Sequence, residues 1–268
     1  MAWRTLHPKH AIERTRVAIV FSELVPEKLQ QAARKNMDQR REELGFESVN
    51  DLSGTAFSLQ INGPNAAVQP QVGPVQGWQF TRTSENGLPL EVIEMNGAEL
   101  SYVSMTYGRW DLFKQRLSKV LGNIPMMLGD VLSRRVTILD YTDRFVFDGD
   151  PLRADATFLL GDLARTVPDA AASGGELWHI NRGWFQETSS RRILVNVNLA
   201  TQDGRLDDKD NVRSVQAFTR TEVRHVEKDR GVEMLFEDLD VLHTVSKKAF
   251  GDSISDDAKK MIGMADGA

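Results

Sequence analysis

Aspartate and histidine are the residues of this chain best suited to catalytic or metal chemistry. Asp140, Asp143, Asp148 and Asp150 lie along or just after one expected strand, and His225 lies on another. Carboxylates and imidazoles act as general acids and bases, or hold a divalent cation, when the fold brings them together. Asp140 and Asp143 are an odd number of residues apart, so a regular strand places them on opposite faces. The spacing therefore argues against a carboxylate pair.

No other spacing predicts a reaction. His7 and His10 are separated by Pro8, and no HExxH or HxH pattern is present. Asp203 belongs to an acidic connection, 202–213, that is more typical of a solvated hairpin end than of a cation site. The chain contains no P-loop, no dinucleotide-binding glycine pattern and no G-x-S-x-G elbow. We therefore expect no catalytic residues, no metal and no cofactor.

Arginines and aromatic residues on the strands of the second half form the candidate binding surface. Arginine beside aromatic side chains suits a polyanion or a protein surface. The segment 176–230 nevertheless has 10 Lys/Arg and 9 Asp/Glu, which is not the strong positive charge of a nucleic-acid-binding surface. Charge pairs along the strands are the alternative interpretation. The expected binding residues are Trp178, Arg182, Trp184, Arg191, Arg192, Arg220, Arg224 and His225.

The composition sets the class of protein. The chain has 268 residues, 41 % of them hydrophobic and 26 % charged, and a net charge of −5. These values are typical of a soluble globular protein with enough apolar surface for a core. Cysteine is absent, which excludes disulfides and thiolate chemistry. The N-terminus has no signal-peptide core and no apolar run approaches a membrane span, so we expect a cytoplasmic protein without a membrane partner.

Hydrophobic periodicity predicts the elements that must position these residues. The helical stripes end or begin near proline, glycine and serine, and Asn-Gly pairs at 86–87 and 96–97 favour tight hairpins. A loop is expected at 62–77 and another at 167–175. Strands are expected at 16–21, 55–61, 75–83, 90–95, 99–106, 135–147, 176–187, 191–201 and 215–227, and helices at 26–43, 109–128, 154–165, 235–250 and, capped by Ser253 or Ser255, up to 261.

The order of these elements predicts an α+β fold. The first half has the order β, α, four β, α, and the second half has the order β, α, three β, α. This order favours two similar lobes, 1–132 and 133–268, with antiparallel sheets backed by helices. One irregular α+β domain without a repeat is the alternative. The sequence leaves open whether the two sheets join into one saddle.

Two stretches together carry a resemblance to a known family. They are 10–17 (HAIERTRV) and 239–250 (LDVLHTVSKKAF), the latter followed by Ser253-Ile254-Ser255. This pattern resembles a sporadically distributed bacterial family of unknown function. The resemblance implies no catalytic residues, and the patchy distribution of that family implies a mobile-element or defence locus. In physical terms, we expect His243 to cap the helix or to pair with Asp240 one turn earlier.

The leading hypothesis for the function is a non-enzymatic binding or assembly protein whose partner is another protein or a second copy of the chain. One alternative is a metal-dependent hydrolase or nuclease that uses Asp140, Asp143, Asp203 and His225. The other is a nucleic-acid-binding protein that uses the arginine-rich strands, with affinity that falls steeply as salt rises.

Overall fold

The computed structural model describes residues 2–7, 10–62, 65–162, 167–173, 175–189, 191–206, 209–229 and 232–264. Together these ranges form one antiparallel sheet of 10 strands and seven α-helices, which confirms the α+β class. None of the described helices has the length and apolar character needed to span a membrane. The strands are β1 Ala2–Thr5, β2 Ile12–Phe21, β3 Ser48–Asn62, β4 Asn65–Thr83, β5 Pro89–Asn96, β6 Glu99–Ser104, β7 Arg134–Asp148, β8 His179–Glu187, β9 Arg192–Leu206 and β10 Lys209–Asp229.

The helices follow the same chain order. They are α1 Glu27–Asp38, α2 Arg41–Leu44, α3 Trp110–Leu121, α4 Ile124–Gly129, α5 Asp169–Ser173, α6 Val232–Ser253 and α7 Asp256–Met261, with 3-10 turns η1 Pro151–Arg153 and η2 Ala156–Phe158.

The strands of both halves of the chain belong to the same sheet. Its order is β3-β4-β5-β6-β2-β7-β10-β9-β8, and β1 pairs with β7. The long strands β2 and β7 pair antiparallel at its centre, with Ala18 opposite Ile138. The last strand of the first half, β6, lies next to β2, and the last strand of the second half, β10, lies next to β7. The sequence left the joining of the two sheets open, and the pairing of β2 with β7 joins them.

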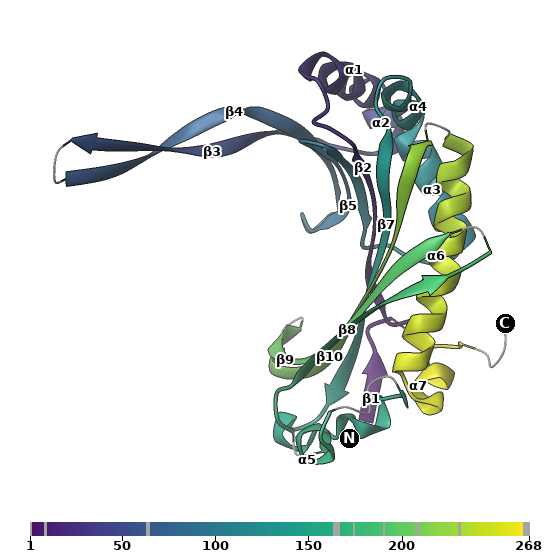
Figure 1. Ribbon diagram of the computed structural model, residues 1–268. Coiled ribbons are helices and arrows are strands. Elements are labelled where there is room, and N and C mark those ends of the chain that lie inside the picture. Colours follow the sequence, from purple (N-terminus) through teal and green to yellow (C-terminus); the bar gives the residue numbers. More distant parts are fainter. Residues whose placement is uncertain are drawn as a thin grey trace.

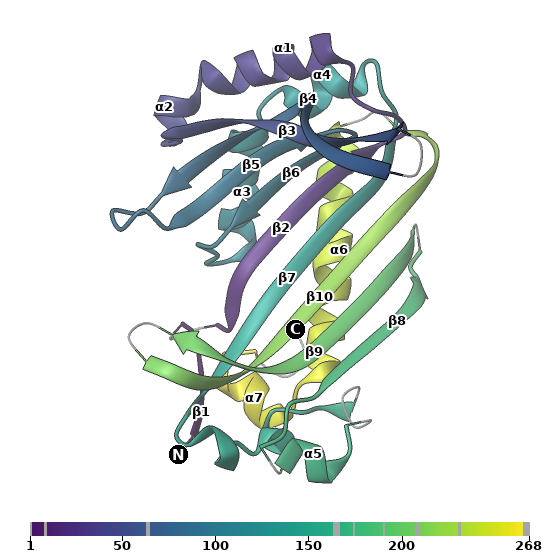
Figure 2. The ribbon, with the colours of Figure 1, turned by 90° about the vertical axis from the view of Figure 1, so that its left-hand side faces the viewer.

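Helices cover one face of this curved sheet and leave the other face open. Figure 1 shows α3, α6 and α7 along one side of the strands, and Figure 2 looks onto the open face with α6 behind it. The side chains of β9 alternate between these faces, because successive residues of a strand point to opposite sides. Ile193 and Val195 are buried on the helix side, where α6 contributes Leu239 and Leu242 to the core.

The strands β3 and β4 continue beyond the sheet as a hairpin arm, which Figure 1 shows projecting from the body. Their pairing runs from Ser48–Thr81 to Asn62–Asn65, whereas β4 pairs with β5 only from Gly77 onward. The loop expected at 62–77 is therefore wrong over the described residues from Asn65. Pro70 lies opposite Phe57 in the arm, where β4 has a free second edge. A proline is tolerated at such an edge, because no strand on that side needs a hydrogen bond from its backbone nitrogen.

Three other expectations need correction. The helix expected at 154–165 is only the turn η2 in its described part, since Leu160 already bridges to Ile254. Residues 163–166 lie outside the described ranges. The expected loop 167–175 contains the short helix α5. The connection 202–213 is largely strand, because β9 and β10 continue into it and Asp203 pairs with Arg213.

Both helices predicted in the first half are interrupted. The segment 26–43 forms α1 and α2, and the segment 109–128 forms α3 and most of α4. The second break comes at Gly122, whose φ of 52° is not helical, and Pro125 lies in the first turn of α4. The cap predicted for the last helix is confirmed, since Ser255 accepts a hydrogen bond from the backbone N–H of Ala258.

Candidate ligand-binding site

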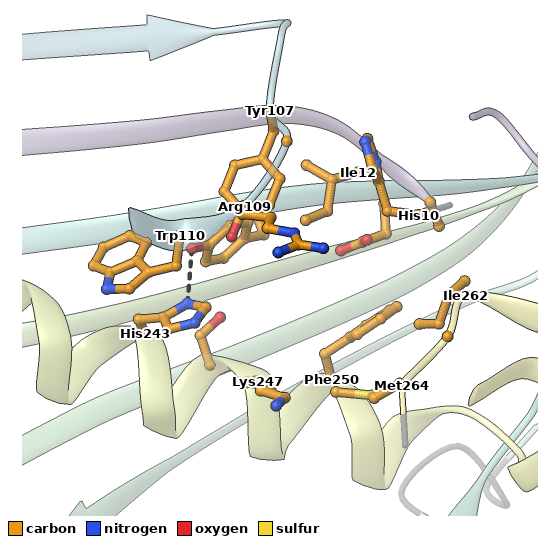
Figure 3. Close-up of a pocket in the computed structure, with 16 residues that line it drawn as sticks. His10, Ile12, Tyr107, Arg109, Trp110, His243, Lys247, Phe250, Ile262 and Met264 are labelled. Atoms are coloured by element: carbon orange, nitrogen blue, oxygen red, sulfur yellow. Dashed lines mark hydrogen bonds between the residues drawn. The ribbon is translucent and has the colours of Figure 1, made fainter. Parts of the chain in front are cut away.

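A pocket of about 510 Å³ lies between the sheet and α6, next to the end of α7 (Figure 3). Its volume is within the range of small-molecule sites, and most of its lining is apolar or aromatic. The lining residues are His10, Ala11, Ile12, Tyr107, Gly108, Arg109, Trp110, Tyr141, Asp143, His243, Ser246, Lys247, Phe250, Ile262, Gly263 and Met264.

Strand and helix periodicity bring these residues together. Tyr141 and Asp143 are two residues apart on β7, so both point toward the helices. Their neighbour Asp140 lies on the open face, as the odd spacing predicts, and bonds to Arg16 there. On α6 the lining residues include His243, Lys247 and Phe250, with i, i+4 and i+7 spacing that places them on one face.

Asp143 is the unusual residue of this pocket. Only 3 % of the surface of this residue is exposed. No hydrogen bond or ion pair joins its carboxyl to another described residue, and this burial raises its pKa to about 8. A carboxyl with this pKa is mostly protonated at pH 7, so it can donate one hydrogen bond and accept others. The site therefore holds a neutral polar group that is buried without a described protein partner.

His243 is held between two aromatic residues. Its ring stacks on Trp110, with 4.3 Å between the ring centroids and 6° between the planes. Its Nδ1 atom is 3.0 Å from the hydroxyl of Tyr141, and burial lowers its pKa to about 4. Asp240 accepts hydrogen bonds from Trp110 Nε1 and Lys114 Nζ instead of from His243. The expected local pairing of His243 with Asp240 is thus replaced by a contact with the sheet.

The other tyrosine and histidine rings that line the pocket are neutral as well. Tyr107 meets Tyr141 edge-on at 5.7 Å, and burial raises the pKa of Tyr107 to about 12 and that of Tyr141 well above its ordinary value. His10 meets Tyr107 edge-on at 6.1 Å, and burial lowers its pKa. The buried Nδ1 of His10 has no hydrogen-bond partner among the described residues. The wall can therefore stack on a planar ligand and offer it hydrogen bonds.

Two cations border the pocket. Arg109 precedes α3, and Lys247 lies on α6; both side chains belong to exposed residues. Figure 3 shows Arg109 among the other lining side chains and Lys247 on α6. Neither forms an ion pair with a described residue. Since the neighbouring Asp143 is mostly neutral at pH 7, these cations are the charged groups of the described lining.

One serine also lines the pocket. Ser246 is a buried hydroxyl in the lining, but no hydrogen bond joins it to His243 or Asp143. A serine nucleophile needs such a base within hydrogen-bond reach. Within the described ranges, no group of three or more histidine and acidic side chains is placed to hold a metal ion.

The expected binding residues are divided among three places. Arg220 and Arg224 lie on the open face, where both pair with Glu222. Arg182 and Trp184 share the helix side of the edge strand β8, where these half-buried residues lie opposite Val197 and Val195. Trp178 lies just before β8 and packs against the same core, as the spacing permits.

The other three form contacts at the ends of the strands. Arg191 and His225 approach the buried carboxylate of Asp238 on α6, at 2.8 Å and 3.4 Å. Arg192 lies over the ring of Phe185 at 4.4 Å and also contacts Glu187. The eight residues thus lie in three separate places of the fold.

The residues of the hydrolase hypothesis are also separated. Asp140 bonds to Arg16 on the open face, and Asp143 lines the pocket on the opposite face. Asp203 is held by Arg213, and His225 lies against Asp238. No shared cation site can form among them in this arrangement.

Most of the pocket was missed from the sequence, because its residues come from five separated segments. One signal was present. The stretches 10–17 and 239–250, which carry the resemblance to a bacterial family, both contribute to the lining. No family model matches the chain, and no curated protein matches it.

Proposed function

We propose that this protein is a non-enzymatic binding protein and that its pocket holds a small organic ligand. The observation that carries this proposal is Asp143, a residue only 3 % exposed that lines the pocket and whose carboxyl has no hydrogen-bond partner among the described residues. Buried polar groups are normally hydrogen-bonded, since desolvation without a partner costs about 1–3 kcal/mol. A ligand that bonds to Asp143 removes this cost in the bound state.

The shape and chemistry of the lining support the same proposal. A volume of about 510 Å³ accommodates a ligand of two or more rings. Contact with the aromatic rings of the lining, such as Tyr107 and Phe250, supplies affinity, and a few polar groups set the orientation. Ser246 has no hydrogen-bonded base, so turnover by a serine mechanism is not supported.

A thermal-shift screen with planar aromatic compounds tests this function. The blocking variant is Gly108→Trp, because no heavy atom lies within 4 Å of a Cβ at Gly108. A second, Ile262→Trp, fills the pocket from the end of α7. The matched control is Gly204→Trp, where the space for a Cβ is equally open but outside this pocket. We expect compounds that raise the melting temperature of wild type and of the control but not of the blocked variants.

The proposal is wrong if no compound shifts the wild-type protein. It is equally wrong if the shifts persist in both blocked variants, because the ligand then binds elsewhere. A binding role in assembly is a second candidate, favoured by the hairpin arm: beyond Thr55–Val72 it pairs only with itself.

We also propose that the chain consists of two similar lobes, 1–132 and 133–268. The strand order supports this: β2 pairs with β6 in one half, as β7 does with β10 in the other. A long helix follows the last strand in each half, α3 or α6. Separate expression of the two segments tests the independence of the lobes.

A further inference from the structure

The charges around the pocket indicate which ligands it favours. Asp143, His10 and His243 are mostly neutral at pH 7, for the reasons given above. Arg109 and Lys247 are the cationic side chains of this lining and have no ion pair among the described residues. Among the residues that the structure describes, the pocket therefore offers two cations at its border and no fixed negative charge in its lining.

The acidic residues nearby do not change this balance. Asp111 and Asp240 are close enough to act on the pKa of His243, but neither lines the pocket. Asp240 is already paired with Lys114 at 2.9 Å. A cationic ligand would face Arg109 and Lys247 without an ionised carboxylate to balance them, so the chemistry disfavours it.

The polar groups also differ in depth. Asp143 is buried against the sheet, whereas Arg109 and Lys247 are exposed at the border. Rings of Tyr107, Trp110 and Phe250 lie among the lining residues. A ligand that uses all three features has a planar body, a neutral hydrogen-bonding edge and an acidic group.

We propose that the ligand is a planar organic anion, with its rings against the aromatic wall, its neutral polar edge at Asp143 and its phosphate or carboxylate between Arg109 and Lys247. This inference rests on the proposed binding function and names its ligand class. The acidic group has two sources, a nucleoside monophosphate or an aromatic carboxylic acid.

Calorimetric titration with paired probes tests the inference. The phosphate pair is GMP and guanosine, and the carboxylate pair is indole-3-acetate and indole-3-acetamide; each pair differs in the acidic group. Titrations use the wild-type chain, the double variant Arg109→Gln/Lys247→Gln and the blocked variant Gly108→Trp. The control is Arg153→Gln/Lys248→Gln, which removes two exposed cations outside the pocket lining.

We expect at least one anion to bind the wild type more tightly than its neutral partner does. The double variant should weaken that anion about tenfold or more, the value for lost charge-assisted hydrogen bonds, and leave the neutral partner nearly unchanged. The probe pair that shows this difference identifies whether the acidic group of the ligand is a phosphate or a carboxylate.

Two outcomes overturn the inference, and they differ in what they say about the proposed function. If the neutral probes bind as tightly as the anions and Gly108→Trp abolishes both, the pocket binds ligands but does not select anions. If no probe binds at about 1 mM, the anion inference fails for these ligands. The thermal-shift screen with planar aromatic compounds then decides separately whether the pocket binds any ligand.

Discussion

At the scale of single residues, the environment of Asp143 conflicts with the ordinary chemistry of its side chain. An aspartate is normally ionised at pH 7, but burial against a wall of neutral rings favours the protonated form. Tyr107, Tyr141, His10 and His243 face it from the strand β7, the adjoining loops and α6. Arg109 and Lys247 stay at the exposed border, where water screens their charges.

This residue predicts a pH dependence of stability. Burial raises the pKa of Asp143 from 3.8 to about 8, so the folded chain keeps a proton that the unfolded chain releases. The free energy of unfolding must therefore fall as pH rises between these values. Asp143→Asn cannot ionise, so its melting temperature relative to wild type should rise across this range. Melting curves at several pH values check this, with the exposed Asp130→Asn as control; a difference that does not change with pH contradicts it.

The ring of His243 predicts the opposite behaviour on the acid side. Burial lowers its pKa from 6.5 to about 4, so the unfolded chain binds the proton first. Stability should be complete above pH 6.5 and decrease as pH falls toward 4. His243→Phe keeps a ring on Trp110 and should remove this part of the acid sensitivity. Denaturant titrations at pH 7 and pH 5 measure the change in unfolding free energy, with the exposed His179→Gln as control. An equal loss of stability in wild type, His243→Phe and His179→Gln would refute the prediction.

At the scale of elements, α6 is fixed to the sheet by more than its apolar stripe. The carboxylate of Asp238 is fully buried. It accepts hydrogen bonds from Arg134 Nη2 at 2.9 Å and from Arg191 Nε at 2.8 Å. Arg134 begins β7, and Arg191 immediately precedes β9. The same helix carries one wall of the pocket, so this cluster sets the position of His243 and Lys247 relative to the sheet.

Removing this carboxylate should destabilise the whole chain. Asp238→Ala leaves the guanidinium of Arg134, only 6 % exposed, without its ion pair to α6, and breaking a buried pair costs about 3–5 kcal/mol. Asp252→Ala on the same helix breaks an exposed pair with Lys248 and should cost less than about 1 kcal/mol. Urea unfolding of both variants decides this, and similar costs would show that the buried cluster contributes little.

At the scale of the whole molecule, the body and the arm depend on different interactions. The body has helices packed on one face of the sheet, whereas the arm from Thr55–Val72 to Asn62–Asn65 pairs only within itself. An extension of this kind adds little to the core, and a protruding hairpin with free edges is a pairing surface for another chain.

Excision of the arm separates stability from assembly. Leu52 lies opposite Gly77, so replacing 53–76 by Asn-Gly closes the hairpin with a two-residue turn. We expect the unfolding free energy of the body to change by about 1 kcal/mol or less, since no strand of the body pairs with the excised residues. If the arm mediates self-association, light scattering should report a smaller particle after excision. Equal masses would exclude that role, and a collapsed melting temperature would contradict the independence of the body.

Much of the local structure could be predicted from the sequence, because short-range physics decides it. Alternating side chains placed Asp140 and Asp143 on opposite faces, and the Asn-Gly pairs mark turns in which Gly87 and Gly97 have positive φ. The cap at Ser255 follows from side-chain chemistry alone.

Only the tertiary structure decided the rest. The pairing of β2 with β7 joined the halves, the pairing of β3 with β4 overrode the proline-rich loop signal, and the meeting of α6 with β7 enclosed the pocket. Each depends on contacts between distant segments, for which local periodicity contains no information. The same holds for Asp143: the sequence by itself determined its face of the strand, but only the packed helices determined that its carboxyl is buried and neutral.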